Sequence, residues 1–197
     1  MKKIKWTQIA ALVIVVMFIL GAFLILNNRN GDVPQSNNKT EYEIITSKVD
    51  GDLDTYYPKT PKTVMETYCR ILKCLQNEKL EESEIEKLVI IQRKMFDEDF
   101  LAENPYVTYL ATVKNDLAKS KKTNSKMSYY VVEFESGVEK NVFNGSNMAN
   151  VQVKFCFSND GALETFYEEY VLREDKDGKY KVFGWKASTE DGFISDK

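Results

Sequence analysis

The feature that most constrains this chain is an uncharged, apolar stretch near its N-terminus. Residues 9–26 form 18 consecutive residues without a charged or strongly polar side chain. At a rise of about 1.5 Å per residue this is long enough to cross a hydrocarbon core, and the stretch has no polar face to turn to water. We therefore predict a single transmembrane helix. Three lysines precede it and only Arg29 follows closely, which predicts that residues 1–8 lie in the cytoplasm and the C-terminal domain is extracellular, at the cell membrane.

The rival interpretation of this stretch is a cleaved signal peptide, because a positively charged start is common to both. Signal peptides have an apolar run of about 7–15 residues, followed by small residues at an A-x-A-like site. The run in this chain is longer, and it ends at residues 23–28 (Phe-Leu-Ile-Leu-Asn-Asn) without such a site. An uncleaved anchor is the favoured interpretation, and a mature chain starting between residues 23 and 28 would instead indicate a secreted protein.

The remainder of the chain is predicted to contain one folded domain. Residues 27–54 are expected to be a flexible linker, because the first part is polar and Ile44 and Ile45 alone suggest a short helix or strand before an acidic, Gly-containing segment. Residues 55–190 have the length of a single domain, and residues 191–197 form a short tail.

The charge balance and the absence of histidine exclude several classes of function. Without the four basic residues before position 30, 23 Lys and Arg stand against 30 Asp and Glu, which disfavours binding to nucleic acid or to anionic lipid surfaces. A chain without histidine cannot form Ser-His-Asp or Cys-His catalytic arrangements or His-containing zinc sites. We expect no cofactor, no metal and no catalytic residue, although acid–base chemistry by Asp, Glu, Lys, Tyr or Cys leaves an enzyme open.

The three cysteines are expected to be small buried hydrophobes. Cys69 and Cys74 are five residues apart, so on a helix their side chains point about 140° apart and do not bridge easily. Cys156 lies in an alternating segment that is typical of a strand. The odd number also leaves at least one thiol unpaired.

The first half of the domain shows helical periodicity. Thr60 is a good N-cap with Pro61 at the first helical position, and the apolar residues that follow recur at three- and four-residue spacing up to Asn77. A second helix is predicted over residues 82–95, where Gln92 shares the inner stripe with three aliphatic residues. A short helical turn over residues 97–101 and a third long helix over residues 105–121 complete this half.

After residue 124 the periodicity changes to two, which is typical of strands. Alternation predicts strands at about residues 130–135, 151–158, 166–173 and 180–187, and the Asp-Lys-Asp-Gly sequence at 175–178 predicts a hairpin turn between the last two. Helices followed by antiparallel strands indicate an α+β fold, with three helices packed on one face of a curved antiparallel sheet of about four strands.

Several short segments resemble an uncharacterised family of membrane-anchored proteins from Gram-positive, Clostridia-type gut bacteria, over roughly residues 57–187. The segments are residues 57–61 (Tyr-Pro-Lys-Thr-Pro), 70–78, 102–105 (Ala-Glu-Asn-Pro), 171–178 and 184–185. The family has no assigned activity. The order of elements also looks like the cone-shaped NTF2-like fold, in which helices lie across a bent sheet and enclose a pocket. That group includes enzymes, ligand binders and exported accessory domains of cell-wall proteins.

A curled sheet would enclose a pocket lined by aromatic side chains, with Arg70 as the charged group that could hold an anion. The candidate residues are Tyr68, Arg70, Tyr130, Phe155, Tyr167 and Trp185. The plainer interpretation places the aromatic residues in the core and Arg70 on an exposed helix face. The Asn-Gly-Ser sequence at 144–146 matches the N-glycosylation pattern, which is short and often occurs by chance.

These observations predict a membrane-anchored extracytoplasmic domain with a non-catalytic binding or envelope-assembly role, whose partners are the membrane and a cell-envelope protein. The alternative is a pocket protein that binds a small ligand or acts as an enzyme. A concave pocket with convergent polar groups would favour the alternative.

Overall fold

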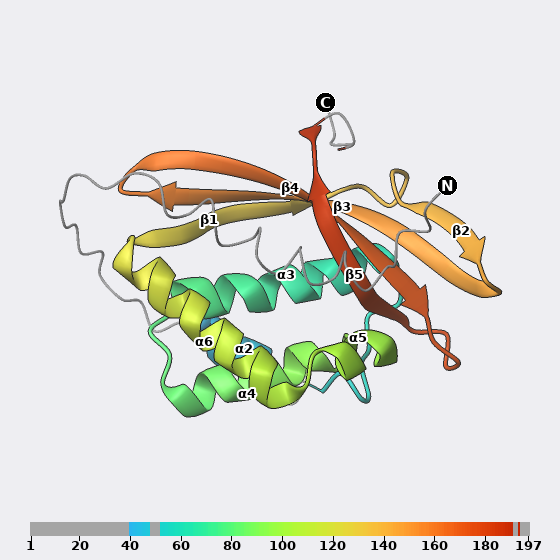
Figure 1. The fold of residues 1–197 in the computed structure, drawn as a ribbon, viewed down its shortest axis with the longest axis horizontal. Coiled ribbons are helices and arrows are strands. Elements are labelled where there is room, and N and C mark those ends of the chain that lie inside the picture. The colour runs from blue at the N-terminus through green and yellow to red at the C-terminus, as the bar shows by residue number, and fades with distance from the viewer. Residues whose placement is uncertain (1–39, 48–51, 191–192, 194–197) are drawn as a thin grey trace.

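The computed structural model describes residues 40–47, 52–190 and 193 of the 197-residue chain. The described residues form helices first and strands afterwards (Figure 1). The helices are α2 (Glu41–Ile45), α3 (Pro61–Asn77), α4 (Glu82–Arg93), α5 (Glu98–Glu103) and α6 (Tyr106–Lys122). The strands are β1 (Ser125–Val132), β2 (Glu139–Phe143), β3 (Ser146–Asn159), β4 (Ala162–Glu174) and β5 (Tyr180–Ser188).

The strands form one antiparallel sheet in the order β1-β3-β4-β5. Strand β2 also pairs with β3, beyond the end of β1, because β1 pairs with residues 153–159 and β2 with residues 146–150. The helices lie together below the sheet in Figure 1, and β5 extends down towards α5. There the Val182 amide donates to the Met95 carbonyl at 2.8 Å and the Val182 carbonyl accepts from the Asp97 amide at 2.9 Å. The sheet is thereby tied to the helical layer.

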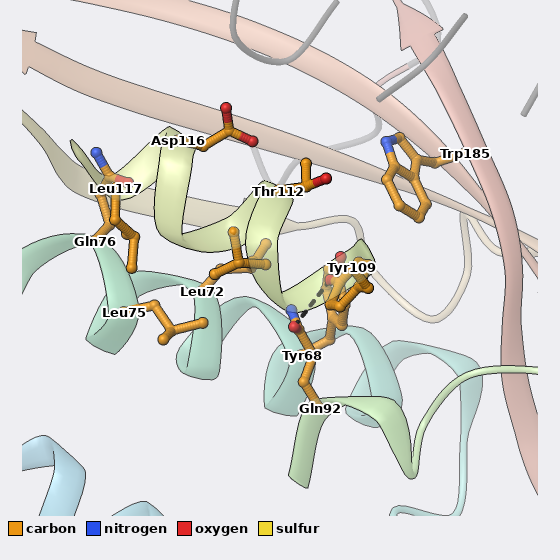
Figure 2. A pocket seen from close by; sticks show the side chains of 11 residues that line it. Tyr68, Leu72, Leu75, Gln76, Gln92, Tyr109, Thr112, Asp116, Leu117 and Trp185 are labelled. Atoms are coloured by element: carbon orange, nitrogen blue, oxygen red, sulfur yellow. Dashed lines mark hydrogen bonds between the residues drawn. The ribbon is translucent and has the colours of Figure 1, made fainter. Parts of the chain in front are cut away.

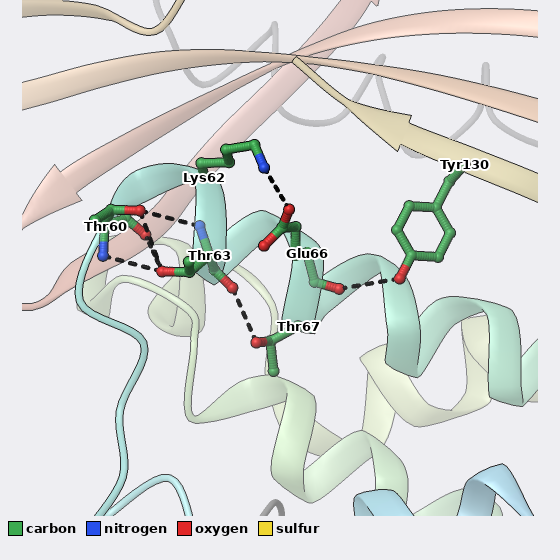
Figure 3. A network of polar contacts seen from close by, with 6 residues as sticks. All are labelled: Thr60, Lys62, Thr63, Glu66, Thr67 and Tyr130. Carbon is green, nitrogen blue, oxygen red and sulfur yellow. Dashed lines mark hydrogen bonds and ion pairs between the residues drawn. The ribbon is translucent and has the colours of Figure 1, made fainter. Parts of the chain in front are cut away.

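Helix α3 begins where the sequence predicts it. The Thr60 hydroxyl accepts from the Thr63 amide at 3.2 Å, and the Thr63 hydroxyl accepts from the Thr60 amide at 3.0 Å (Figure 3). These bonds satisfy amides that have no partner in the first turn, and Pro61 lacks an amide hydrogen that would need one. The Tyr130 hydroxyl of β1 donates to the Glu66 carbonyl at 3.4 Å, so α3 lies directly under the sheet.

The core lies between the helices and the sheet. On β3, Val151, Val153 and Phe155 are buried among the hydrophobic residues of the core, whereas the alternating residues face the opposite side of the sheet. The apolar face of α3 packs against them through Val64, Met65, Tyr68, Ile71 and Leu75, all buried. Burial of these two faces against each other is the main source of stability of the domain.

The fold prediction is confirmed in class and needs correction in detail. The domain is α+β with a five-stranded antiparallel sheet, not four strands, because β2 was missed. The three long predicted helices correspond to α3, α4 and α6, and the predicted turn is α5. Helix α2 lies within the predicted linker of residues 27–54, and Ile45 and Leu53 are buried in the core, so the folded part starts before residue 55.

The transmembrane helix that the sequence predicts is not part of the described fold, and the fold prediction is corrected accordingly. Within residues 40–47, 52–190 and 193, no helix combines the length and the apolar character needed to cross a membrane. The stretch of residues 9–26 lies outside the described residues.

Candidate functional site

A pocket of about 80 Å³ lies where three helices meet the sheet (Figure 2). Helix α3 contributes one wall, α6 contributes the opposite wall, and α4 and β5 each contribute one residue. The lining residues are Tyr68, Leu72, Leu75, Gln76, Gln92, Tyr109, Thr112, Val113, Asp116, Leu117 and Trp185. Most of this lining is apolar, so the few polar groups decide which molecules fit.

A cluster of aromatic rings packs around Trp185, which lines the pocket from the sheet. Tyr170 of β4 is paired with Trp185 of β5, and their rings are stacked with centroids 5.7 Å apart. Tyr170 also meets Tyr68 of α3 edge-on at 5.6 Å, and Phe100 of α5 lies 5.2 Å from Trp185. The rings of Tyr170 and Phe100 hold Trp185 in place, and Tyr68 packs against Tyr170, which gives the pocket a rigid wall.

Two buried N–H groups at this pocket have no hydrogen-bond partner. The Tyr109 hydroxyl donates to Gln92 Oε1 at 3.0 Å, but among the described residues nothing accepts a hydrogen bond from Gln92 Nε2. The same is true of the indole Nε1 of Trp185. Gln92 is 0% exposed and Trp185 7% exposed. Leaving such a donor unpaired costs about 1–3 kcal/mol, and both atoms belong to side chains that line the pocket.

Burial raises the pKa of several ionisable groups in and near the pocket. Burial raises the pKa of Tyr68 and Tyr170 well above their ordinary value, so both hydroxyls stay protonated. The Tyr170 hydroxyl donates at 2.7 Å to Glu168, whose pKa burial raises to about 7. Asp116 is a buried lining residue, and it pairs with Lys119 at 3.1 Å. Burial raises the pKa of Asp116, and the hydrogen bond from Lys119 works against that rise.

The structure distributes the predicted site residues over several places. Tyr68 and Trp185 line the pocket together. Arg70 and Tyr130 line a second hollow, of about 360 Å³, with residues of α2 and α3. In that hollow Arg70 forms an ion pair with Glu41, so its charge is compensated within the chain.

The other two predicted residues lie away from both hollows. Phe155 is part of the core and is 3% exposed. Tyr167 is an odd number of residues from Tyr170 on β4, so it points to the opposite face of the sheet. There Lys154 Nζ lies 5.6 Å from its ring centroid. The curled sheet therefore does not gather all the aromatic residues around one cavity.

Some residues that line the pocket are not among the predicted site residues, and one of them, Gln92, has a signal in the sequence. Gln92 lies on the inner stripe of α4 with Ile85, Leu88 and Val89, and all four are buried. An amide among aliphatic residues on a buried helix face needs hydrogen-bond partners, which points to a polar site. No pattern indicated Tyr109 or Asp116. The three cysteines are buried and free, as predicted.

The fold and the pocket define a small α+β domain with a mostly apolar cavity between its helices and its sheet. The chain matches a domain of unknown function, DUF6715, over residues 1–185, and it belongs to that family. No curated protein matches the chain. The resemblance to an uncharacterised family is thus confirmed, whereas the match does not confirm membrane anchoring, a bacterial source or an NTF2-like fold.

Proposed function

We propose that the domain is a non-catalytic binding module that takes up a small molecule in the pocket between α3, α4, α6 and β5. The observation that carries the proposal is the mostly apolar cavity of about 80 Å³ itself, whose lining includes four neutral polar side chains, Gln76, Gln92, Tyr109 and Thr112. This is the small-ligand alternative of the sequence interpretation, in preference to an assembly role.

The polar groups around the pocket suit binding better than catalysis. Tyr109 is hydrogen-bonded to Gln92, and burial raises its pKa, so its hydroxyl is a poor general base. Asp116 is paired with Lys119, and the chain has no histidine. The other polar side chains that line the pocket, Gln76 and Thr112, are neutral, so they can form hydrogen bonds to a bound molecule but do not supply a general base.

Trp185 provides a direct measurement of binding. The chain has two tryptophans, so in a full-length Trp6→Phe variant Trp185 is the only one. We expect compounds from a library of small molecules to change its fluorescence saturably and to raise the melting temperature, since a ligand at 100 times its Kd stabilises a fold by about 2.7 kcal/mol.

A matched pair of variants controls for unspecific effects. Gln92→Leu should weaken the response, whereas Gln152→Leu should leave it unchanged, because Gln152 is also buried but lies on the opposite face of the sheet. If no compound produces a saturable change in the fluorescence of Trp185, or if both variants lose this response equally, the proposal is wrong.

The second part of the proposal is that this binding takes place outside the cytoplasm, at the cell membrane, near a cell-envelope partner. The charge difference around residues 9–26 supports it. Protease added to intact cells should digest a C-terminal epitope tag on the full chain. A tag that stays protected until the cells are lysed would contradict this location.

A further inference from the structure

Resting on the proposed binding function, we infer that the part of the ligand that enters the pocket is a hydrocarbon group of about three to four carbon atoms. The first argument is the surface that the cavity presents. Leu72 and Leu75 of α3, Val113 and Leu117 of α6 and the ring of Trp185 of β5 all line it. A hydrocarbon that contacts these side chains leaves water, which favours binding in proportion to the apolar area buried.

The hydrogen atoms of two polar side chains in the lining are used within the chain. Thr112 Oγ1 donates to the Thr108 carbonyl at 3.1 Å, and Gln76 Nε2 donates to the Ser125 carbonyl at 3.2 Å. A polar group on the ligand would give up its hydrogen bonds to water and find few replacements here, which is costly. A hydrocarbon group gives up no such bonds.

Gln92 and Tyr109 are also engaged with each other. The Tyr109 hydroxyl donates to Gln92 Oε1 at 3.0 Å (Figure 2). The nitrogens without a partner, Gln92 Nε2 and Trp185 Nε1, each have less than 1 Å² of accessible surface, so a ligand in the cavity does not reach them. Gln92 therefore contributes indirectly, by holding Tyr109 in the wall, and Gln92→Leu removes that bond.

The charges around the pocket disfavour an ionic ligand. Among the described residues that line it, none is a lysine or an arginine, so a buried anion would have no opposite charge. The one acidic lining residue is Asp116, and Lys119 already compensates its charge at 3.1 Å. Neither an anion nor a cation gains a free partner of opposite charge in this lining.

The volume limits the size of the group that enters. A 150 Å³ cavity with an apolar lining takes up benzene or xenon, so by proportion the cavity of about 80 Å³ has room for about three to four non-hydrogen atoms. A short branched alkyl or alkenyl group fits both this size and the lining.

Isobutene, acetone and xenon test this inference. Isobutene and acetone have the same planar shape and differ in a methylene group against a carbonyl oxygen, whereas xenon forms no hydrogen bonds. The readout is the methyl signals of Leu72, Leu75 and Val113 in the full-length chain with ¹³C-labelled leucine and valine methyl groups. We expect isobutene and xenon to shift these signals saturably, with at least tenfold higher affinity for isobutene than for acetone.

Two pairs of variants place the bound probe in the pocket. Val113→Thr keeps the shape of the wall but adds a hydroxyl, and should weaken isobutene binding several-fold, whereas Val142→Thr, at a residue 70% exposed on β2, should not. Leu72→Ala enlarges the cavity and should admit benzene, which the wild type excludes. Leu163→Ala, at a residue 66% exposed, should not admit it.

The outcomes separate the inference from the function on which it rests. If acetone binds as tightly as isobutene, or if Val113→Thr has no effect, the apolar class is overturned. If benzene binds the wild type as well as Leu72→Ala, the size limit is overturned. If neither xenon nor isobutene shifts the methyl signals while a library compound changes the fluorescence of Trp185, only the inference fails. If neither the probes nor library compounds bind, both fail.

Discussion

Replacing Glu168 by glutamine should stabilise the domain at alkaline pH and leave its stability unchanged at acid pH. Glu168 is 8% exposed, lies on the helix-facing side of β4 and accepts a hydrogen bond from the Tyr170 hydroxyl at 2.7 Å. Burial disfavours the charged form of the carboxyl and raises its pKa from 4.5 to about 7. Glutamine has nearly the same shape, keeps an oxygen for Tyr170 and cannot ionise.

The sign and size follow from the two pKa values. Below pH 4.5 the Glu168 carboxyl is protonated in both the folded and the unfolded chain, so it contributes no pH dependence. Between pH 4.5 and about 7 only the folded chain keeps the proton, so the stability of the wild type falls as the pH rises. Since one pKa unit is worth about 1.36 kcal/mol, the loss reaches about 3 kcal/mol above pH 7. Glu168→Gln should gain this amount over the wild type at pH 8 and nothing near pH 4.5.

Urea unfolding of both proteins between pH 4.5 and 8 measures the difference in the free energy of unfolding. Comparing the two proteins at each pH removes the contribution of Glu133, whose pKa burial also raises to about 7. Glu103→Gln removes an exposed carboxyl of α5 and should change the stability by less than about 0.5 kcal/mol at every pH. A difference between the wild type and Glu168→Gln that is constant over this range would refute the reasoning.

The remaining predictions concern an ion pair, a turn and the thiols. Arg173→Met leaves the buried Asp97 without its ion-pair partner and should reduce the free energy of unfolding, measured by urea unfolding, by about 3 kcal/mol. Lys140→Met removes only an exposed ion pair with Glu135 and should reduce it by less than about 1 kcal/mol. Equal losses would contradict this. Gly161→Ala should lower the stability by about 1 kcal/mol because its φ is +91°, and Gly184→Ala, which has open space and no positive φ, should be close to neutral in the same assay. The three cysteines should react with a thiol reagent only after unfolding, since all are buried, and fast labelling of the folded protein would refute their placement.

The sequence predicted the helices well because their signals are local. The cap at Thr60, the proline after it and the three- and four-residue spacing of apolar residues all lie within α3 itself. Each of these features acts over a few residues, so the pattern identifies the helix without knowledge of the rest of the chain.

Strand β2, which the alternation does not predict, has a local signal in the turn that follows it. Asn144 and Gly145 have φ of +50° and +81°, as a two-residue hairpin turn between β2 and β3 requires. Asp160 and Gly161 form the equivalent turn between β3 and β4, with φ of +48° and +91°. The same Asn-Gly-Ser sequence also matches a glycosylation pattern, and all five residues of β2 are exposed, so no alternation marks the strand.

The sequence by itself determined where the long helices and four of the five strands form, and which classes of chemistry the chain lacks. The tertiary structure alone decided that Tyr68 and Trp185 share a pocket with Gln92, and that Tyr167 lies on the other side of the sheet. The physical reason is that periodicity is a property of neighbouring residues, whereas a cavity depends on how side chains from distant helices and strands fill the space between them. The two unpaired donors of the pocket arise from that packing, and no spacing in the sequence encodes them.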